Sequence, residues 1–301
     1  MFNPTTDIPD LSGKVILVTG GTAGIGKESV LELAKHNPAR ISFTGRDAKR
    51  AAEVITAAEA VGGDSVAVVF VECDLTSLAS VHQAAKRIAS ESDRLDILIC
   101  SAGVLVPAAL TKDGYEVHFG INHIAHALLI KLLLPTLLRT CEVHHSDVRI
   151  VSTTSEGFFL HPRGGILFDS LRTARPASFK LARYGQSKLA NILFAAELAR
   201  RHPQLVALSV HPGTVRTELV AKLDGVTKAL TYLGRPFSMK TPKEGAYNQL
   251  WAATADREGI VNGEYYEPVG VRGRHARKSR NVELAKRLWE WTEKELVRYQ
   301  L

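Results

Sequence analysis

Cysteine is scarce in this chain, which has three cysteines among 301 residues. The odd number argues against a disulfide framework and is typical of proteins in a reducing compartment. Cys73 and Cys100 lie in strand-like apolar runs, where a thiol behaves as a small buried hydrophobe. We therefore expect a cytoplasmic protein without disulfides.

Long hydrophobic runs are also missing. The most apolar stretch, IAHALLIKLLLPTLL at 124–138, is shorter than the ~20 residues that a membrane span needs, and it contains His126, Lys131 and Pro135. The N-terminal segment MFNPTTDIPD is polar and acidic, unlike a secretory signal. These features predict a soluble protein with no membrane span, in which the apolar stretch is a buried helix.

Acidic residues are absent from one segment, RGRHARKSR at 272–280, which holds five of the charges that make the chain basic overall. A basic run can bind nucleic acid or an anionic membrane surface. However, no aromatic residues are interleaved with it and no nucleic-acid-binding motif accompanies it. A solvated loop is the simpler interpretation, and we expect no nucleic-acid partner.

Apolar runs of strand length alternate with helical patterns along the whole chain. Strands are expected at 15–19, 41–44, 66–71, 95–100, 148–153, 206–210 and 263–266. Helices are expected at 27–36, 47–62, 78–89, 115–138, 184–201 and 282–297. This alternation predicts a Rossmann-type, doubly wound parallel β-sheet of about seven strands with helices on both faces, in one domain over 1–301. Ligands in such folds bind at the carboxyl ends of the strands.

The segment TGGTAGIG at 19–26 follows the first expected strand and opens a helix, which is the context of a dinucleotide-binding turn. Glycine permits positive φ angles and close approach to phosphate. The helix N-terminus offers unpaired N–H groups and a favourable dipole to a pyrophosphate. A tight turn that binds nothing is the alternative. Cofactor contacts are expected from Gly20, Thr22, Gly24, Ile25 and Gly26.

Arg46 stands just past the second expected strand. An acid at this position suits the ribose 2′-hydroxyl of NAD, whereas an arginine suits the 2′-phosphate of NADP. We therefore expect NADP(H) rather than NAD(H), with Asp47 as a helix cap. Asp74 ends the third strand, where it could accept a hydrogen bond from adenine or cap the next helix.

Tyr184 and Lys188 lie four residues apart in YGQSKLANILFAAELARR, so both side chains share one helix face. A lysine ammonium beside a phenol favours the phenolate. Tyr184 could then exchange a proton near neutral pH. The isolated pair occurs by chance in many chains, so the other motifs decide its meaning.

The motifs occur in a fixed order that resembles the short-chain dehydrogenase/reductase family. They are the glycine turn, Asp74-Leu75, Cys100-Ser101-Ala102-Gly103, Asn122, Ser155, Tyr184 with Lys188, and His211-Pro212-Gly213. The phrases DGYEVHFGINHIAHALLIKLLLP and YGQSKLANILFAAELARR are similar to the retinol-dehydrogenase-like and WW-domain-oxidoreductase-like branch and its fungal relatives. The resemblance covers residues 12–270 and concerns fold and reaction type, not the substrate.

The resemblance implies a role for each matching residue. Tyr184 would donate or accept the proton, Lys188 would lower its pKa and hold the nicotinamide ribose, and Ser155 would bind the substrate oxygen. Asn122 would position a water in a proton relay. Further cofactor contacts would come from Asp74, Leu75, Ser101, Ala102, Gly103, Pro212, Gly213, Val215 and Thr217, of which Thr217 would hold the nicotinamide carboxamide. No metal is expected, although His118, His123 and His126 share the helix of Asn122.

Two departures from the family pattern leave questions open. Cys100-Ser101 replaces a pair of asparagines, which concerns the scaffold more than the chemistry. Thr153-Thr154-Ser155 replaces the usual ending, so Thr154 or Ser152 could supply the hydroxyl if the register shifts, because adjacent strand residues face opposite sides.

Two apolar segments, 156–183 and 213–241, are expected beside the substrate, where they would form an apolar lid. The alternative is that they pack on each other or form an oligomer face. The expected helices at 115–138 and 184–201 match those that pair family members, which suggests a homodimer or homotetramer.

The sequence therefore predicts an NADP(H)-dependent oxidoreductase. It would interconvert a lipophilic or aromatic ketone or aldehyde and the corresponding alcohol, with secondary metabolism as one setting. A lyase, epimerase or cyclase on the same scaffold is one alternative. An NADP-binding regulatory protein is another, although such a protein would be expected to lose Tyr184 or Lys188.

Overall fold

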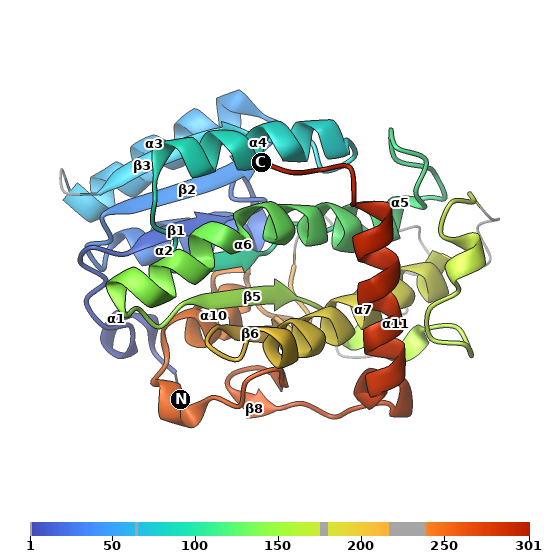
Figure 1. Cartoon of the computed structure of the whole chain (residues 1–301). Helices are drawn as coiled ribbons and strands as arrows, with labels where there is room; N and C mark the ends of the chain where they lie inside the picture. Colours follow the sequence, from blue (N-terminus) through green and yellow to red (C-terminus); the bar gives the residue numbers. More distant parts are fainter. Residues whose placement is uncertain (1, 64–65, 175–179, 217–238) are drawn as a thin grey trace.

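The computed structural model describes residues 2–63, 66–174, 180–216 and 239–301. They form an α/β fold with one β-sheet and helices on both of its faces, as the alternating pattern predicts (Figure 1). The strand order is β3-β2-β1-β4-β5-β6-β7-β8. The strands are β1 (Val15–Val18), β2 (Arg40–Gly45), β3 (Ala67–Glu72), β4 (Ile97–Cys100), β5 (Arg149–Thr153), β6 (Val206–Val210), β7 (Tyr265–Glu267) and β8 (Val271–Arg272).

The sheet has eight strands in the described part of the chain, one more than predicted. The extra strand is β8, which pairs antiparallel with β7, whereas every other pairing is parallel. Val271 and Arg272 are both exposed. A two-residue exposed edge strand has no apolar period, so no sequence pattern could mark it.

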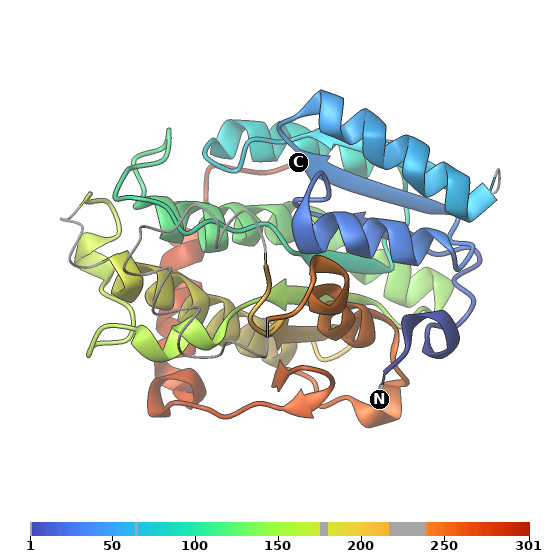
Figure 2. The ribbon, with the colours of Figure 1, turned by 180° about the vertical axis from the view of Figure 1, so that it is seen from behind.

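Side chains of the central strands alternate between two apolar cores. Leu17 and Leu98 belong to the core under α4 (Leu78–Glu91), α6 (Ala125–His144), α7 (Lys180–Arg201) and α11 (Val282–Glu295). Ile16 and Ile99 belong to the core under α2 (Gly24–Ala34), α3 (Ala48–Gly62) and α10 (Pro242–Thr254), the face seen in Figure 2. A short helix α1 (Pro4–Asp7) precedes β1.

The order of strands reverses beside β1. The chain runs outward from β1 to β2 and β3, then returns to place β4 on the other side of β1. The two chain segments that leave β1 and β4 therefore diverge at the carboxyl edge of the sheet. This topological switch point is where ligands bind in open α/β sheets.

The helix predicted at 115–138 is longer and less regular than expected. It comprises α5 (Val117–Phe119), a wide π-helical turn at Gly120–Ile124 and α6. Among the described residues it is the one helix, Val117–His144, that meets the length and composition of a membrane span, so the argument from length was wrong. However, 78% of its most apolar window is buried inside the protein, as in a core helix.

Helix α10 was not predicted, although its start has a clear sequence signal. Thr241 and Glu244 form a capping box in which each side chain accepts a hydrogen bond from the other residue's backbone N–H, and Pro242 occupies the first turn. The helix packs mainly against α2 and supplies buried polar residues, Asn248 and Gln249, to the middle of the fold. Because the apolar residues of α10 have only a weak helical period, the sequence pattern does not predict this helix.

Helix α11 crosses α6 and α7 on the outer face of the molecule (Figure 1). Trp289 stacks on Phe194 of α7 with ring centroids 4.8 Å apart, and Glu293 forms an ion pair of 2.7 Å with Lys131 of α6. The chain's own C-terminal helix therefore covers apolar surface that had suggested a homodimer or homotetramer. A homodimer or homotetramer stays a prediction.

Replacing Trp289 with alanine tests how firmly α11 is docked. Trp289 is buried, so Trp289→Ala should lower the free energy of unfolding by roughly 3–5 kcal/mol, as for other buried tryptophans. Urea unfolding followed by circular dichroism measures the change. Val297→Ala, at an exposed position just past α11, is the control and should have little effect. A loss below about 1 kcal/mol would mean that α11 contributes little to the fold.

Candidate active site

The glycine turn lies at the switch point, between β1 and α2. Gly20 has a φ of 69°, and a Cβ there would lie 3.0 Å from the Cα of Ala102, which follows β4. A Cβ at Gly26 would lie 2.4 Å from the carbonyl oxygen of Gly20. Any side chain at these two positions would therefore disturb the turn, and only glycine fits.

The N-terminus of α2 is left open by the sequence. Its first flanking residue, Ala23, has no side chain that could accept a hydrogen bond from the helix. By contrast, α3, α4 and α11 are capped by the side chains of Asp47, Ser77 and Asn281. An uncapped helix start at the carboxyl edge of the sheet leaves backbone N–H groups for an anionic ligand.

Arg46 is exposed just after β2, where the sequence placed it. The neighbouring Asp47 accepts a hydrogen bond from the backbone N–H of Arg50, 3.0 Å away, and so caps α3 as predicted. It also lies 3.5 Å from the Arg50 guanidinium. The acidic residue beside Arg46 is therefore already engaged in the start of α3.

Asp74 does not cap α4, contrary to one of the two interpretations offered by the sequence. Ser77 is the cap, and the Asp74 carboxylate accepts hydrogen bonds from the backbone and hydroxyl of Thr76 and pairs with Lys112. Burial alone would raise the pKa of Asp74, but these hydrogen bonds lower it. Leu75 next to it is buried.

Ser155 and Tyr184 are brought together from segments far apart in the sequence. Both side chains lie beside Gly157, where the Ser155 hydroxyl is close enough to the Tyr184 phenol to lower its pKa, and the Ser155 oxygen accepts the backbone N–H of Gly157 at 3.1 Å. The hydroxyl of Thr154 instead donates to the carbonyl of Lys188 at 2.7 Å. The alternative register, in which Thr154 takes the place of Ser155, is therefore wrong.

Lys188 is buried, and its ammonium donates a hydrogen bond to the carbonyl oxygen of Thr153 at 3.0 Å. It lies 5.7 Å from the centre of the Tyr184 ring. Burial lowers the pKa of Lys188 to about 8, because a charge is costly to hold away from water. The pair shares one helix face, as its spacing predicts.

The expected lowering of the Tyr184 pKa is not what this arrangement produces. Burial raises the pKa of the Tyr184 phenol, and the hydrogen bond from Ser155 offsets only part of that shift. The Lys188 ammonium is directed at Thr153 rather than at the phenol. Burial therefore favours the protonated form of the Tyr184 phenol.

Asn122 lies in the wide turn before α6 and is completely buried. Its side-chain oxygen accepts the N–H of Val104 at 2.8 Å, and its nitrogen donates to the Val104 carbonyl and to Ser187. The amide thus binds the segment after β4 to α7. The water-positioning role that the resemblance implied for Asn122 stays a prediction.

The segment after β4 passes close to this cluster. A Cβ at Gly103 would lie 3.3 Å from the Lys188 ammonium and 3.4 Å from the Asn122 oxygen. The Ser101 hydroxyl donates to Gln249 of α10, which also accepts from Thr153. These bonds support the view that the change from asparagine to Cys100-Ser101 concerns the scaffold.

The segment after β6 supplies the remaining predicted residues. Pro212 and Gly213 leave the end of β6, where Gly213 has a φ of 87°, and Val215 is buried and bridges to Lys240. Thr217, assigned to the carboxamide, lies outside the described residues.

Glu116 and His118 are buried beside Tyr184, but the sequence did not single out Glu116 and indicated His118 only as a residue that could bind a metal. The Nδ1 of His118 lies 2.7 Å from Glu116, and its Nε2 accepts the backbone N–H of Val106. The His118 ring meets Tyr184 edge-on, with centroids 6.2 Å apart. The signal available in the sequence was a glutamate two residues before a histidine.

The expected apolar lid over 156–183 is only partly seen. Phe158, Ile166 and Leu171 are buried in the core, which favours the packing interpretation. Phe159 and Leu160 remain exposed beside the Ser155 loop. Residues 175–179 and 217–238 of the two substrate-side segments, with Phe179, Leu219 and Phe237 among them, lie outside the described residues.

The basic segment folds back onto the protein. Arg274 lies 3.4 Å from Glu156, which follows Ser155, and 3.6 Å from Glu267. His275 contacts Glu264 at 2.5 Å. The segment is therefore partly held by ion pairs and is not simply a solvated loop.

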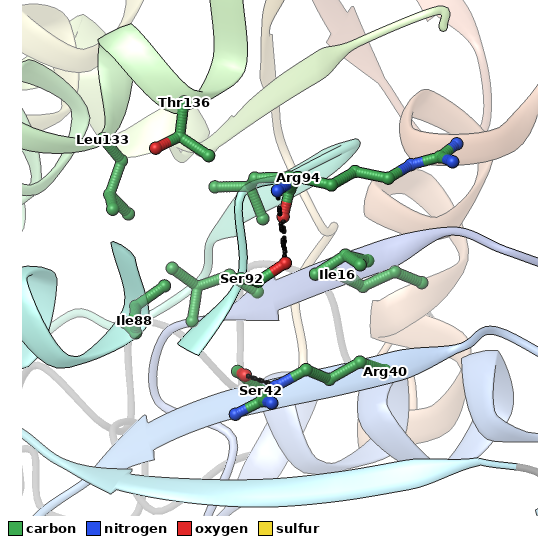
Figure 3. Close-up of a pocket in the computed structure, with 11 residues that line it drawn as sticks. Ile16, Arg40, Ser42, Ile88, Ser92, Arg94, Leu133 and Thr136 are labelled. Carbon is green, nitrogen blue, oxygen red and sulfur yellow. Dashed lines mark hydrogen bonds between the residues drawn. The ribbon is translucent and has the colours of Figure 1, made fainter. Parts of the chain in front are cut away.

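A small cavity of about 10 Å³ lies at the opposite edge of the sheet (Figure 3). Ile16, Arg40 and Ser42 line it where β1 and β2 begin, together with Arg94 before β4. This is room for about one water molecule. The cavity is far too small for a substrate and lies away from the Tyr184 cluster.

Comparison with known proteins agrees with this geometry. Residues 14–226 match the family model described as short chain dehydrogenase. The chain belongs to the short-chain dehydrogenase family. A short-chain dehydrogenase/reductase of Armillaria gallica is 35% identical over 304 residues, covering 97% of this chain and 95% of the relative. Human retinol dehydrogenase 11 is 36% identical over 288 residues, covering 95% and 86%.

A solved structure also resembles this short-chain dehydrogenase. The Pseudomonas aeruginosa RhlG/NADP active-site complex aligns with a TM-score of 0.68 at 24% identity, covering 87% of this chain and 96% of that chain. At this identity the likeness concerns the fold. The predicted family, with its fungal and retinol-dehydrogenase relatives, is confirmed.

Removing the buried charge of Lys188 should stabilise the protein. The pKa of Lys188 is lower in the folded state than in the unfolded state. At pH 7 the cost of burying the charged ammonium therefore opposes folding. Lys188→Met should raise the free energy of unfolding at pH 7 by about 1–3 kcal/mol, after loss of the hydrogen bond to Thr153. Urea unfolding measures the change.

The gain should depend on pH in a defined direction. Between the folded pKa of about 8 and the ordinary lysine pKa of 10.5, the unfolded state binds more protons, so wild-type stability rises with pH and the advantage of Lys188→Met shrinks. Lys86→Met, at an exposed helix position, is the control and should show no such trend. A Lys188→Met protein that is less stable at pH 7 would contradict the assignment of a buried charge.

Proposed function

We propose that this protein is an NADP(H)-dependent oxidoreductase that interconverts a lipophilic or aromatic ketone or aldehyde and the corresponding alcohol. The observation that supports it most is the joining of Ser155, Tyr184 and Lys188 beside the glycine turn, at the switch point of a short-chain dehydrogenase. A cytoplasmic location and a role in secondary metabolism are parts of the same proposal.

The residues present fit a dinucleotide. No side chain projects from the turn at Gly20, which packs closely on Ala102, and the open N-terminus of α2 offers backbone N–H groups to a pyrophosphate. Tyr184 and Lys188 would hold the nicotinamide ribose. A bound nicotinamide supplies or accepts the hydride at the reacting carbon.

Arg46 favours NADP(H) over NAD(H). Its guanidinium is exposed at the end of β2, and a planar guanidinium matches a phosphate with two hydrogen bonds. The nearby acid, Asp47, caps α3 and lies close to Arg50, so it does not take the place that an NAD enzyme gives to an acid.

The hydroxyls of Ser155 and Tyr184 would bind the substrate oxygen. Negative charge grows on this oxygen during reduction, and two preoriented donors stabilise it where water is largely excluded. Tyr184 is held protonated by burial, so it can deliver its proton to the alkoxide that forms. Oxidation of an alcohol reverses these steps.

Lys188 would assist the transfer of the proton from Tyr184. Its ammonium stabilises the tyrosinate left after proton transfer, and its pKa of about 8 lies close enough to neutrality for it to exchange a proton. The bond to Thr153 holds it in place beside the ring. The carbonyl of Thr153 thus fixes the position of the Lys188 ammonium.

A lipophilic substrate is supported by the exposed apolar surface beside Ser155. Phe159 and Leu160 follow it in the loop and are 42% and 51% exposed. The human relative is named for retinol, an apolar alcohol. An apolar substrate would cover such side chains.

Tyr184→Phe tests the proton-transfer role. Without the hydroxyl, kcat should fall by about 10²–10⁴-fold while the affinity for NADPH stays nearly unchanged, since the ring and Lys188 remain. NADPH consumption with a panel of lipophilic aldehydes and ketones measures turnover. Tyr247→Phe, at another half-buried tyrosine, is the control. A variant that retains more than about a tenth of wild-type kcat would show that Tyr184 is misassigned.

Arg46→Ala tests the cofactor preference. Loss of a charge-assisted contact of about 1.5–3 kcal/mol should reduce kcat/KM for NADPH by roughly 10- to 100-fold and leave that for NADH unchanged. Arg50→Ala, in the first turn of α3, is the matched control. Equal losses with both cofactors would refute a contact between Arg46 and the 2′-phosphate.

A further inference from the structure

His126 links two parts of the site that the sequence keeps more than a hundred residues apart. It lies one helical turn after Asn122 and is buried. Its Nε2 is 2.9 Å from the hydroxyl oxygen of Thr19, and its Nδ1 is 3.2 Å from the carbonyl oxygen of Asn122. Thr19 is the residue between β1 and the glycine turn.

The hydrogen bonds determine which nitrogen of His126 carries the proton. The Asn122 carbonyl can only accept, so Nδ1 must be the donor. In a neutral ring Nε2 then accepts from the Thr19 hydroxyl, whose oxygen in turn accepts the backbone N–H of Ala102 at 3.1 Å. Every donor and acceptor in this chain has a partner in that one arrangement.

The surroundings of His126 favour the neutral ring. Burial lowers the pKa of His126 to about 4, and the positive charge of Lys188 acts in the same direction. The imidazole therefore stays uncharged through the neutral range. A neutral ring keeps the distinct donor and acceptor that this chain of bonds requires.

We propose that His126 is a positioning residue, which holds the start of the glycine turn at a set distance from the helix that carries Asn122. This role rests on the proposed function, because it matters for turnover only if the turn binds a dinucleotide. Thr19 is continuous with Gly20, and Ala102 is at once bonded to Thr19 and packed on Gly20. His126 thus braces the contact that shapes the turn.

The consequence is a fixed relation between the cofactor and the catalytic side chains. The helix of Asn122 is bonded to α7 through Ser187, next to Lys188. A turn that moves relative to this helix would move the dinucleotide relative to Tyr184 and Lys188, and hydride and proton transfer tolerate little misplacement. His126 connects the glycine turn, through Thr19, to the catalytic side chains, through the carbonyl of Asn122.

His126→Phe removes both hydrogen bonds but keeps a ring in the helix. Leaving the buried acceptor on Asn122 and the Thr19 hydroxyl without their partner should weaken NADPH binding by about 10- to 100-fold. His123→Phe is the matched control: His123 is also buried, in the wide turn just before α6, but its ring packs between Phe119 and Phe194. It should change the Kd by less than about 3-fold, a few tenths of a kcal/mol.

Thr19→Val tests the bridge without altering the helix core, and it serves if His126→Phe fails to fold. It should weaken NADPH binding as His126→Phe does. Of the two single variants, one will bind NADPH less tightly. The double variant should have a Kd for NADPH at most about 3-fold higher than that one, because both substitutions break the same linkage. Fully additive losses would show that His126 and Thr19 act separately.

Two further readouts separate this role from plain stability and from the proposed function. Nitrogen-15 NMR of the wild-type ring should show the Nδ1–H tautomer at neutral pH, and an Nε2–H tautomer would overturn the bridge. Wild-type protein that binds NADPH, with equal Kd changes in His126→Phe and His123→Phe, would overturn the role of His126 alone. Wild-type protein that binds neither NADPH nor NADH would overturn the proposed function and this role together.

Discussion

The docking of α7 on the end of β5 is the constraint on which the site depends. The Lys188 ammonium and the Asn191 amide both donate to the carbonyl of Thr153, and the Thr154 hydroxyl donates back to the carbonyl of Lys188. These three buried bonds allow one register between helix and strand. In that register Tyr184, one turn before Lys188, lies against Ser155.

Holding this register has an electrostatic cost that the two apolar cores must offset. A lysine ammonium is taken out of water with one carbonyl oxygen as its hydrogen-bond partner in the described structure. The sheet strands on either side are buried on both faces, and α11 adds stacked aromatic rings over α7. The large buried core thus supports a local arrangement that is unfavourable by itself, as is common at sites of chemistry.

Much of the architecture was predictable because it follows from periodicity. The buried strands β1 and β4 are continuous apolar runs, and the cap at Asp47 and the glycine turn have local signals. Prediction failed where the apolar periodicity is weak, absent or misleading. The exposed edge strand β8 is too short to show a period, and α10 has little apolar periodicity despite its capping box. The wide turn at Gly120–Ile124 looks like ordinary helix in the sequence.

The sequence by itself determined the family, the sheet, the glycine turn and the residues from which the candidate site is built, because these depend on residue type and spacing along one element. Only the tertiary structure decided which hydroxyl of the 153–155 run lies beside Tyr184, and that the Asn122 side chain is bonded to the backbone of Val104. It also decided the sign of the Tyr184 pKa shift. Burial and hydrogen bonding between distant segments are properties of packing, and spacing along the chain does not encode them.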